Sequence, residues 1–253
     1  MRRIWIEPES ITRPTITLSG EAFHHAIQVT KFQVGEEFEV VFGGAQALRV
    51  RVREVSKKTA FLDIVGERKL PVLPLPQVNL AVCLPRWATF ESVIEKCVEM
   101  GVHTLQPLVS EFSFIRSTRE ISQARQERWQ KINKSAVEQS GRGSLLQIPP
   151  VQELRPFVQG LNRKSSVACL FAYEGGSPLD VRAELVRLKA AQPQEIWAVV
   201  GSEGGFSESE REFMRTVGHA PVTLGEQILR VETACFTLVS VIKYEFELLR
   251  GGT

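Results

Sequence analysis

The stretch that most constrains the fold is residues 196–244, because it contains two strand–turn–helix units in succession. The apolar runs at 196–200 and 222–224 have the length and composition of buried strands. Each run leads into a turn that contains glycine and then into a helix. After the first turn, Ser207 and Glu210 have the spacing of a helix capping box. Repeated units of this kind predict an α/β fold with a parallel sheet, in which ligands bind at the carboxyl ends of the strands.

The first turn, residues 201–205, reads GSEGG and has the composition of a ligand-binding loop. Its three glycines allow positive φ angles and a close approach of the backbone to a ligand. A phosphate cradle fits poorly, because no Lys-Ser/Thr pair follows and Glu203 would place a negative charge inside it. The loop fits a ligand that is cationic or that offers N–H and hydroxyl donors. A tight turn in which Glu203 caps the next helix explains the same residues equally well.

The second turn contains an arginine in an apolar neighbourhood. Arg230 lies between Leu229 and Val231, immediately before Glu232 and a helix start. A buried and unpaired guanidinium would be too costly, so Arg230 must either be paired or face a cleft. Two interpretations are therefore open: a structural salt bridge to Glu232, or a cation presented to a ligand.

Both turns carry a resemblance to a known family. GSEGGF followed by LGEQILRVETA resembles the signature of the SPOUT methyltransferases, and more narrowly of the RsmE-type rRNA (uracil-N3)-methyltransferases. Further matching segments, in the same order, are HHAIQVTKFQVGEEFEV, ESVIEKCVEMGVHTLQPLVSE and AVEQSGR. The resemblance spans essentially the whole chain and is least specific between about residues 148 and 166. It implies a carboxyl-terminal trefoil knot that encloses S-adenosylmethionine, a homodimer, and methylation of N3 of one uridine in the decoding region of small-subunit (16S) rRNA.

The resemblance also implies roles for individual residues. The catalytic candidates are Arg230, Glu203 and Glu138. Arg230 keeps its proton, so its expected role is to orient the uracil and to stabilise negative charge on the carbonyl oxygens. Glu203, Glu138 or Glu232 could accept the N3 proton, and a cap at the end of its helix explains Glu138 equally well. The residues expected to hold the cofactor are Glu174, Gly175, Gly201, Ser202, Gly204, Gly205, Leu224, Gly225, Ile228, Leu229, Thr233 and Ala234. The expected RNA contacts are Lys31, Arg49, Arg51, Arg53, Arg86, Arg116 and Arg142.

The first 73 residues read mostly as strands. Segments at 2–6, 15–18, 36–42, 48–55 and 59–65 are rich in β-branched and aromatic residues, and the one helical suggestion is at 21–29. In 48–55, apolar residues alternate with three arginines, which places a basic row on one face of the strand. That row indicates either a contact with the RNA backbone or a solvated strand face. The resemblance implies a PUA-like β-barrel RNA-binding domain over 1–73.

Three prolines in residues 69–77 indicate a linker, with a domain boundary near Pro74. Beyond it, runs at 78–84, 103–110 and 167–172 predict strands that alternate with helices. Thr89 is expected to cap the first of these helices, which ends at Gly101. A long helix is expected at about 120–139 and a further helix at about 179–190. The fold prediction is α/β, with a SPOUT α/β-knot methyltransferase domain over 74–253.

The net charge and the positions of the cysteines indicate what kind of protein this is and where in the cell it is expected. The 253 residues have a formal net charge of +2, so an RNA-binding surface must be a local patch. No apolar run is long enough for a transmembrane helix, and the histidines form no metal-binding pattern. The four cysteines lie in apolar runs without zinc-ligand or disulfide spacing. We therefore expect reduced core thiols, no metal, no membrane and a cytoplasmic location.

Four residues depart from the pattern of the resembled family. Ser202 replaces a usual proline, Gln227 a common arginine, Lys31 an arginine and Thr89 a lysine. Arginine and lysine are not interchangeable at bidentate phosphate contacts. Two alternatives therefore stay open: an RNA-binding ribosome-assembly factor with a lapsed active site, and the same fold methylating a different rRNA or tRNA nucleotide.

Overall fold

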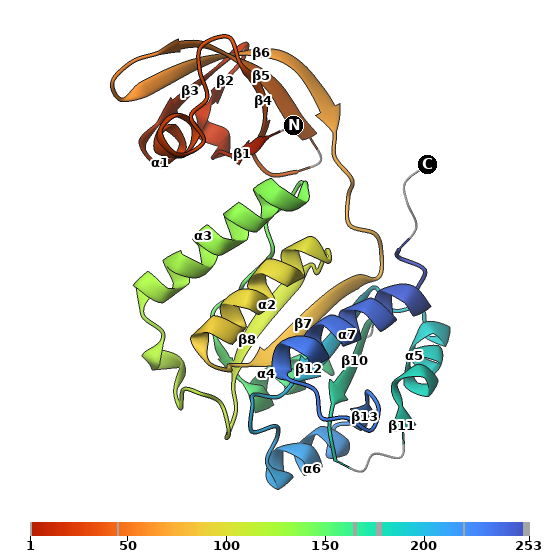
Figure 1. Cartoon of the computed structure of the whole chain (residues 1–253). Helices are drawn as coiled ribbons and strands as arrows, with labels where there is room; N and C mark the ends of the chain where they lie inside the picture. Colours follow the sequence, from red (N-terminus) through yellow and green to blue (C-terminus); the bar gives the residue numbers. More distant parts are fainter. Residues whose placement is uncertain (1, 45, 164–165, 176–178, 220, 250–253) are drawn as a thin grey trace. The chain divides into compact units, whose positions relative to one another are not determined.

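The computed structural model describes residues 2–44, 46–163, 166–175, 179–219 and 221–249 (Figure 1). The chain divides into two compact units. The first comprises Met1–Val72 with Asn133–Leu145, and the second Leu73–Ile132 with Leu146–Thr253. The sequence did not predict that a segment from the middle of the chain belongs to the first unit. The predicted division into 1–73 and 74–253 therefore leaves Asn133–Leu145 out of the amino-terminal unit.

A six-stranded sheet forms the first unit, in the order β1-β4-β5-β6-β3-β2. Its strands are β1 (Arg3–Trp5), β2 (Ile11–Thr12), β3 (Thr15–Ser19), β4 (Glu37–Val41), β5 (Gln46–Val55) and β6 (Thr59–Lys69). The five expected strands are thus confirmed. The expected helix is a short α1 (Gly20–Phe23) that continues as a π-helical segment, His24–Val29. In β5, Leu48, Val50 and Val52 are buried and the three arginines between and after them are exposed, as the alternation predicts.

A seven-stranded sheet forms the second unit, in the order β11-β13-β10-β12-β7-β8-β9, and every described strand pair in it is parallel. The strands are β7 (Gln77–Cys83), β8 (Thr104–Val109), β9 (Gln152–Glu153), β10 (Val167–Ala172), β11 (Leu179–Asp180), β12 (Glu195–Val200) and β13 (Pro221–Thr223). The predicted parallel sheet is therefore confirmed. Residues 70–76, where the proline linker is expected, belong to no helix or strand.

Helices cover both faces of this sheet (Figure 1). They are α2 (Trp87–Glu99), α4 (Leu154–Leu161), α5 (Val181–Ala190), α6 (Glu208–Thr216) and α7 (Val231–Glu245). A further helix, α3 (Gln123–Ser140), packs against α2, where the ring centres of Trp129 and Phe90 lie 4.7 Å apart. Side chains of α4 and α6 pack in one apolar cluster with Ala81, Cys83, Cys169, Phe171 and Trp197. Residues that alternate with these along the strands point to the opposite face. The helices α2 and α7 contact each other, and α7 also contacts β7 and β12.

Some helix ends were predicted correctly from local sequence signals and others were not. The capping box of Ser207 and Glu210 at the start of α6 is confirmed, with both reciprocal hydrogen bonds present. The expectation that Thr89 caps α2 is wrong. That helix begins at Trp87 with Arg86 as its N-cap, so Thr89 lies in its first turn. The region 148–166 contains α4, which no motif identified.

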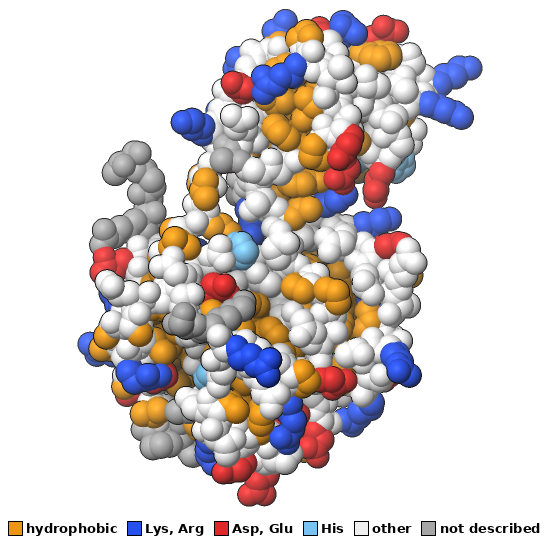
Figure 2. Space-filling model, turned by 180° about the vertical axis from the view of Figure 1, so that it is seen from behind, with side chains coloured by type: hydrophobic (Ala, Val, Ile, Leu, Met, Phe, Trp, Pro, Cys, Tyr) orange, Lys and Arg blue, Asp and Glu red, His pale blue; other side chains and the backbone are white. Residues whose placement is uncertain are grey.

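The remaining expectations concern cysteines, membrane segments and charge. All four cysteines are free and buried, as expected. Among the described residues, none of the helices combines the length and hydrophobicity that a membrane span needs. Figure 2 shows basic and acidic side chains interspersed over the face that it depicts, rather than one continuous basic surface.

A buried ion cluster in the first unit gives a stability prediction. Glu39 is 7% exposed and accepts hydrogen bonds from Arg3 Nε (2.8 Å) and from Arg68 Nε and Nη2 (2.6 and 2.8 Å). Arg68, with help from Arg3, lowers the pKa of Glu39 from 4.5 to about 2. A carboxylate with a lowered pKa stabilises the fold fully above its unfolded pKa, and this stabilisation is lost as the pH falls from about 4.5 towards 2.

We expect Glu39→Gln to lower the free energy of unfolding at pH 7 by about 3 kcal/mol, because two arginines lose their charged acceptor. Urea unfolding at pH 7 and at pH 2.5 checks this. The difference between variant and wild type should shrink strongly at the lower pH. Glu37→Gln is the matched control, because the Glu37–Arg51 pair (2.6 Å) is a surface pair that contributes about 0–1 kcal/mol. An equal loss at both pH values would contradict the electrostatic explanation.

Candidate functional site

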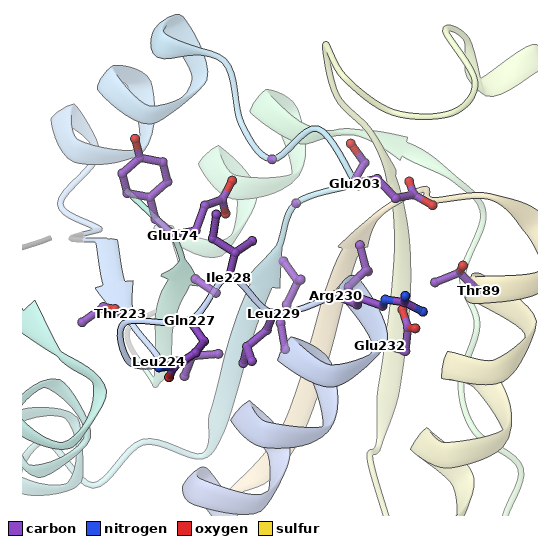
Figure 3. A pocket seen from close by; sticks show the side chains of 18 of the residues that line it. Thr89, Glu174, Glu203, Thr223, Leu224, Gln227, Ile228, Leu229, Arg230 and Glu232 are labelled. Atoms are coloured by element: carbon purple, nitrogen blue, oxygen red, sulfur yellow. The ribbon is translucent and has the colours of Figure 1, made fainter. Parts of the chain in front are cut away.

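A cavity of about 530 Å³ opens in the second unit where β10, β12 and β13 end (Figure 3). Three loops and the first turns of α2 and α7 contribute to it. The lining residues are Arg86, Thr89, Ala172, Tyr173, Glu174, Val200, Gly201, Ser202, Glu203, Gly205, Thr223, Leu224, Gly225, Gln227, Ile228, Leu229, Arg230, Val231, Glu232 and Ala234. The carboxyl ends of parallel strands are where an α/β sheet binds ligands.

The glycine loop after β12 is folded tightly back on itself. The Gly205 N–H donates to the carbonyl oxygen of Ser202 (2.9 Å), and Gly205 has a φ of +69°. A Cβ at Gly201 would lie 2.9 Å from the backbone carbon of Gly205, so a side chain there requires the backbone to shift. The Ser202 hydroxyl donates to the carbonyl oxygen of Phe112 (2.6 Å). The glycines are therefore required by the close approach of backbone to backbone beside the cavity.

Glu203 connects this loop to α2. Its carboxylate accepts a hydrogen bond from the backbone N–H of Arg86, the N-cap residue of α2 (3.0 Å). The interpretation that Glu203 caps the next helix is wrong, because Ser207 and Glu210 cap α6. The Glu203 carboxylate instead lines the cavity together with Arg86. The geometry thus places an acid and a cationic residue at the same edge of the cavity.

The loop between β13 and α7 forms a second wall of the cavity, in addition to the glycine loop after β12. Gly225 has a φ of +120°, and its N–H donates to the Thr223 hydroxyl (3.2 Å), which in turn donates to the Gly225 carbonyl (2.9 Å). This closed turn is available to glycine because other residues rarely adopt such a φ. Ile228, on the same loop, is 78% exposed.

Arg230 is the N-cap residue of α7, and its side chain is exposed at the cavity (Figure 3). Within the described ranges, its guanidinium takes part in no ion pair, and the salt bridge to Glu232 is not formed. Its side chain makes no capping hydrogen bond either. Of the two interpretations left open by the sequence, the structure supports a cation presented to a ligand.

The third loop follows β10 and contains Tyr173 and Glu174. The guanidinium of Arg211 lies 4.8 Å from the centre of the Tyr173 ring and also donates to its hydroxyl. A Cβ at Gly205 would lie 2.7 Å from Glu174 Oε1, so this acid lies against the glycine loop. Tyr173, Thr223 and Val200 also line the cavity but are not among the predicted site residues, and each lies at or next to a strand end. The rule that ligands meet the ends of parallel strands could have identified them.

The structure brings most of the predicted cofactor residues together. Glu174, Gly201, Ser202, Gly205, Leu224, Gly225, Ile228, Leu229 and Ala234 line the cavity. Gly175, Gly204 and Thr233 do not. A Cβ at Gly175 would clash with the Tyr173 side chain and a Cβ at Gly204 would lie 2.9 Å from Phe112 Cβ, so both glycines give room to neighbouring side chains of the loops.

Of the three catalytic candidates, Arg230 and Glu203 line the cavity and Glu138 does not. Glu138 belongs to the first unit, where it accepts from the Trp5 backbone N–H (2.7 Å) and lies 3.3 Å from His25 Nδ1. Burial raises the pKa of Glu138, although both of these partners act in the opposite direction. In this chain Glu138 thus links its helix to the amino-terminal sheet.

The predicted RNA contacts fall into separate places. Arg86 lines the cavity. In the first unit, Arg49 and Arg51 pair with Glu37 (3.7 and 2.6 Å), and Arg53 pairs with Asp63 (3.0 Å). The arginine row is therefore exposed but partly neutralised. Lys31 is exposed and has a φ of 59°. The Arg116 side chain donates to the Glu111 carbonyl. Arg142 is buried, and its guanidinium donates to Ser144 and to the Leu145 carbonyl.

The chain is similar to known RNA methyltransferases. The family model of an RNA methyltransferase domain matches residues 72–243, and that of an RNA methyltransferase PUA domain matches residues 18–65. The chain is 34% identical to a ribosomal RNA small subunit methyltransferase E of Synechocystis, over 92% of this chain and 74% of that one. It is 31% identical to the protein of the same name in Bacillus subtilis, over 94% and 93%. A crystal structure of that enzyme from Neisseria gonorrhoeae, bound to S-adenosylmethionine, has a TM-score of 0.81 and 26% identity, covering 96% of this chain and 97% of the other.

Proposed function

The chain belongs to the RNA methyltransferase family, and on that basis we propose that it methylates N3 of one uridine in the decoding region of 16S rRNA, with S-adenosylmethionine as methyl donor. Its fold is the SPOUT α/β type with a PUA domain at the amino-terminal end. The main support for this function is Arg230, which lines a cavity bordered by glycine turns and has no ion-pair partner among the described residues.

The residues of the cavity fit the methyl donor. A volume of about 530 Å³ lies in the range of pockets for small molecules. The tightly folded loop at Gly201 and the turn at Gly225 line the cavity, and Leu224, Leu229 and Ala234 provide apolar walls. These loops would hold the adenosine and methionine parts. When bound, S-adenosylmethionine would supply an electrophilic methyl group, whose bond to the sulfonium would break with the sulfur leaving as a neutral thioether.

The uracil N3–H must lose its proton as the N3–CH₃ bond forms, and negative charge develops on the uracil carbonyl oxygens. Arg230 can donate hydrogen bonds to these oxygens and stabilise that charge. The carboxylates of Glu203 and Glu232 line the same cavity and can accept the proton. We propose that Glu203 accepts the N3 proton, because a hydrogen bond from the Arg86 N–H holds its carboxylate in position.

We expect Glu203→Gln to lower the transfer rate at pH 7 by about 100-fold, a typical contribution of a general base. The amide oxygen can still accept from Arg86, so the loop should keep its structure. The variant should recover activity in alkaline solution, where uracil N3 loses its proton to solvent. Rate profiles from pH 6 to pH 10 check this, with Glu232→Gln measured in parallel. A normal rate for Glu203→Gln together with a slow Glu232→Gln would assign the proton to Glu232.

The substrate and assembly are part of the proposal. The 16S rRNA target, the cytoplasmic location and a homodimer follow from the family resemblance. The exposed Ile228 and Tyr244 near the two ends of α7 (78% and 76% exposed) support a subunit contact. Light scattering after gel filtration tests this, with a dimer mass expected and a monomer mass contradicting it.

Thr89 and Gln227 line the cavity at positions where the resembled family has cations, which favours methylation of a different nucleotide as the second candidate. Calorimetric titration with S-adenosylmethionine and transfer of labelled methyl to small ribosomal subunits test the proposed activity. Methyl-donor binding with transfer to a nucleoside other than uridine would support the second candidate. A chain that folds but binds no S-adenosylmethionine would support a lapsed assembly factor.

A further inference from the structure

The segment after β8 exposes aromatic side chains in an alternating pattern. Ser113 and Ile115 are 2% and 4% exposed, whereas Phe112 and Phe114 are 44% and 51% exposed and Arg116 is also exposed. Two phenylalanines and an arginine therefore face solvent while the residues between them are anchored inside. Large exposed aromatic side chains in a fixed position are typical of a binding surface.

Hydrogen bonds hold this segment in place. The Ser110 N–H donates to the Ser113 hydroxyl (2.9 Å), and the Phe114 N–H donates to the carbonyl of Leu84 (2.8 Å). The Glu111 N–H donates to the Glu210 carboxylate of the α6 capping box (2.8 Å). The exposure of the two rings is therefore a property of an anchored loop.

The same segment lies beside the cavity. The Phe112 carbonyl accepts from Ser202 of the glycine loop, and a Cβ at Gly204 would lie 2.9 Å from Phe112 Cβ. The Phe114 ring meets Trp87 edge to face, with ring centres 5.5 Å apart. Trp87 directly follows Arg86, which lines the cavity. Phe112 and Phe114 thus form an aromatic platform next to the glycine loop, at the edge where Glu203 and Arg86 line the cavity. Trp87 is half-buried with the Arg125 guanidinium 4.7 Å from its ring centre, and it supports Phe114 from the side.

We infer that this aromatic platform stacks unpaired bases of the RNA next to the target uridine, an inference that rests on the proposed function. A uridine whose N3 is to be methylated must leave its base pair, so neighbouring bases lose stacking partners. Aromatic side chains replace such partners for any base. Arg86, which directly precedes Trp87, and Arg116, which follows Phe114 by two residues, are both exposed, and their positive charge matches the negative charge of the phosphates.

The test uses an RNA hairpin with 2-aminopurine beside the target uridine and no methyl donor, so that binding is measured apart from transfer. We compare the wild type with Phe112→Leu/Phe114→Leu and Phe112→Trp/Phe114→Trp. Leucine keeps apolar bulk and removes the π face, whereas tryptophan keeps the π face. Val186→Ala, which truncates an exposed apolar side chain on α5, is the control.

Wild-type protein should quench the 2-aminopurine fluorescence on binding. The leucine variant should lose the quenching and bind the RNA about tenfold more weakly or worse, with unchanged S-adenosylmethionine affinity, whereas the tryptophan variant and Val186→Ala should bind like the wild type. The salt dependence of RNA binding should be the same in the leucine variant as in the wild type. Arg116→Gln should instead reduce the slope of log K against log salt concentration by about one relative to the wild type.

Normal RNA affinity in the leucine variant would overturn the inference. So would a change in dimer mass with RNA affinity intact, because a second copy of the chain would then cover the platform. Quenching without transfer to any RNA would instead contradict the proposed methylation and leave the platform supported.

Discussion

Replacing Arg230 with alanine is expected to lower kcat for methyl transfer by about 100- to 1000-fold, the usual cost of removing a group that stabilises developing negative charge. The affinity for S-adenosylmethionine should change little, because the charge that Arg230 stabilises forms only during transfer. The fold should survive, since the side chain makes no capping hydrogen bond to α7. Single-turnover transfer to small subunits measures the rate, and calorimetry measures the affinity.

Two further variants separate charge from bulk at this position. Arg230→Lys keeps the charge and loses the planar fork, so we expect an intermediate rate. Arg215→Ala removes an exposed arginine of α6 that does not line the cavity, and its rate should equal that of the wild type. Equal rates for Arg230→Ala and Arg215→Ala would contradict the role assigned to Arg230.

Replacing Gly201 with alanine is expected to weaken the binding of S-adenosylmethionine about tenfold or more. The new Cβ would lie 2.9 Å from the Gly205 backbone, and backbone cannot move aside as the end of a side chain can. Overpacking of this kind typically costs about 1–3 kcal/mol, and here the strain falls on the wall of the cavity. Calorimetric titration with S-adenosylmethionine measures the loss.

Gly160→Ala is the matched control for this substitution. Gly160 lies on α4, is exposed, and a Cβ there would meet no atom within 4 Å. Alanine within a helix is more favourable than glycine, so this variant should bind the methyl donor normally and unfold at a slightly higher temperature. If Gly201→Ala bound the methyl donor as tightly as Gly160→Ala does, the glycine loop would not be part of its site.

Local signals in the sequence predicted the elements whose cause is itself local. The alternation at Leu48–Val52 fixes which face of β5 is buried, and the Ser207–Glu210 spacing fixes the start of α6. Hydrogen bonds and burial within a few residues decide both features. The glycine turn at Gly201–Gly205 was recognisable for the same reason, because close backbone contact within five residues requires glycine.

Features that depend on contacts between distant residues could not be predicted. The role of Glu203 is set by an N–H of Arg86, 117 positions away, which no spacing rule contains. Glu138 accepts from Trp5, 133 positions away, so its helix end belongs with the amino-terminal sheet. The start of α2 two residues before Thr89 likewise has no local cap to announce it. The identities of the methyl donor and of the RNA substrate come from the family resemblance, because the residue patterns alone specify neither.

We propose that this cavity directs a methyl group to N3 of a uridine in 16S rRNA. The most direct test incubates the protein and labelled S-adenosylmethionine with small ribosomal subunits from a strain that lacks this protein. The rRNA is then digested and the labelled nucleoside is identified by mass spectrometry. We predict that the label appears as 3-methyluridine with the wild type and is nearly absent with Arg230→Ala. Label in any other nucleoside, or no label in subunits incubated with folded protein, would contradict methylation of uridine N3.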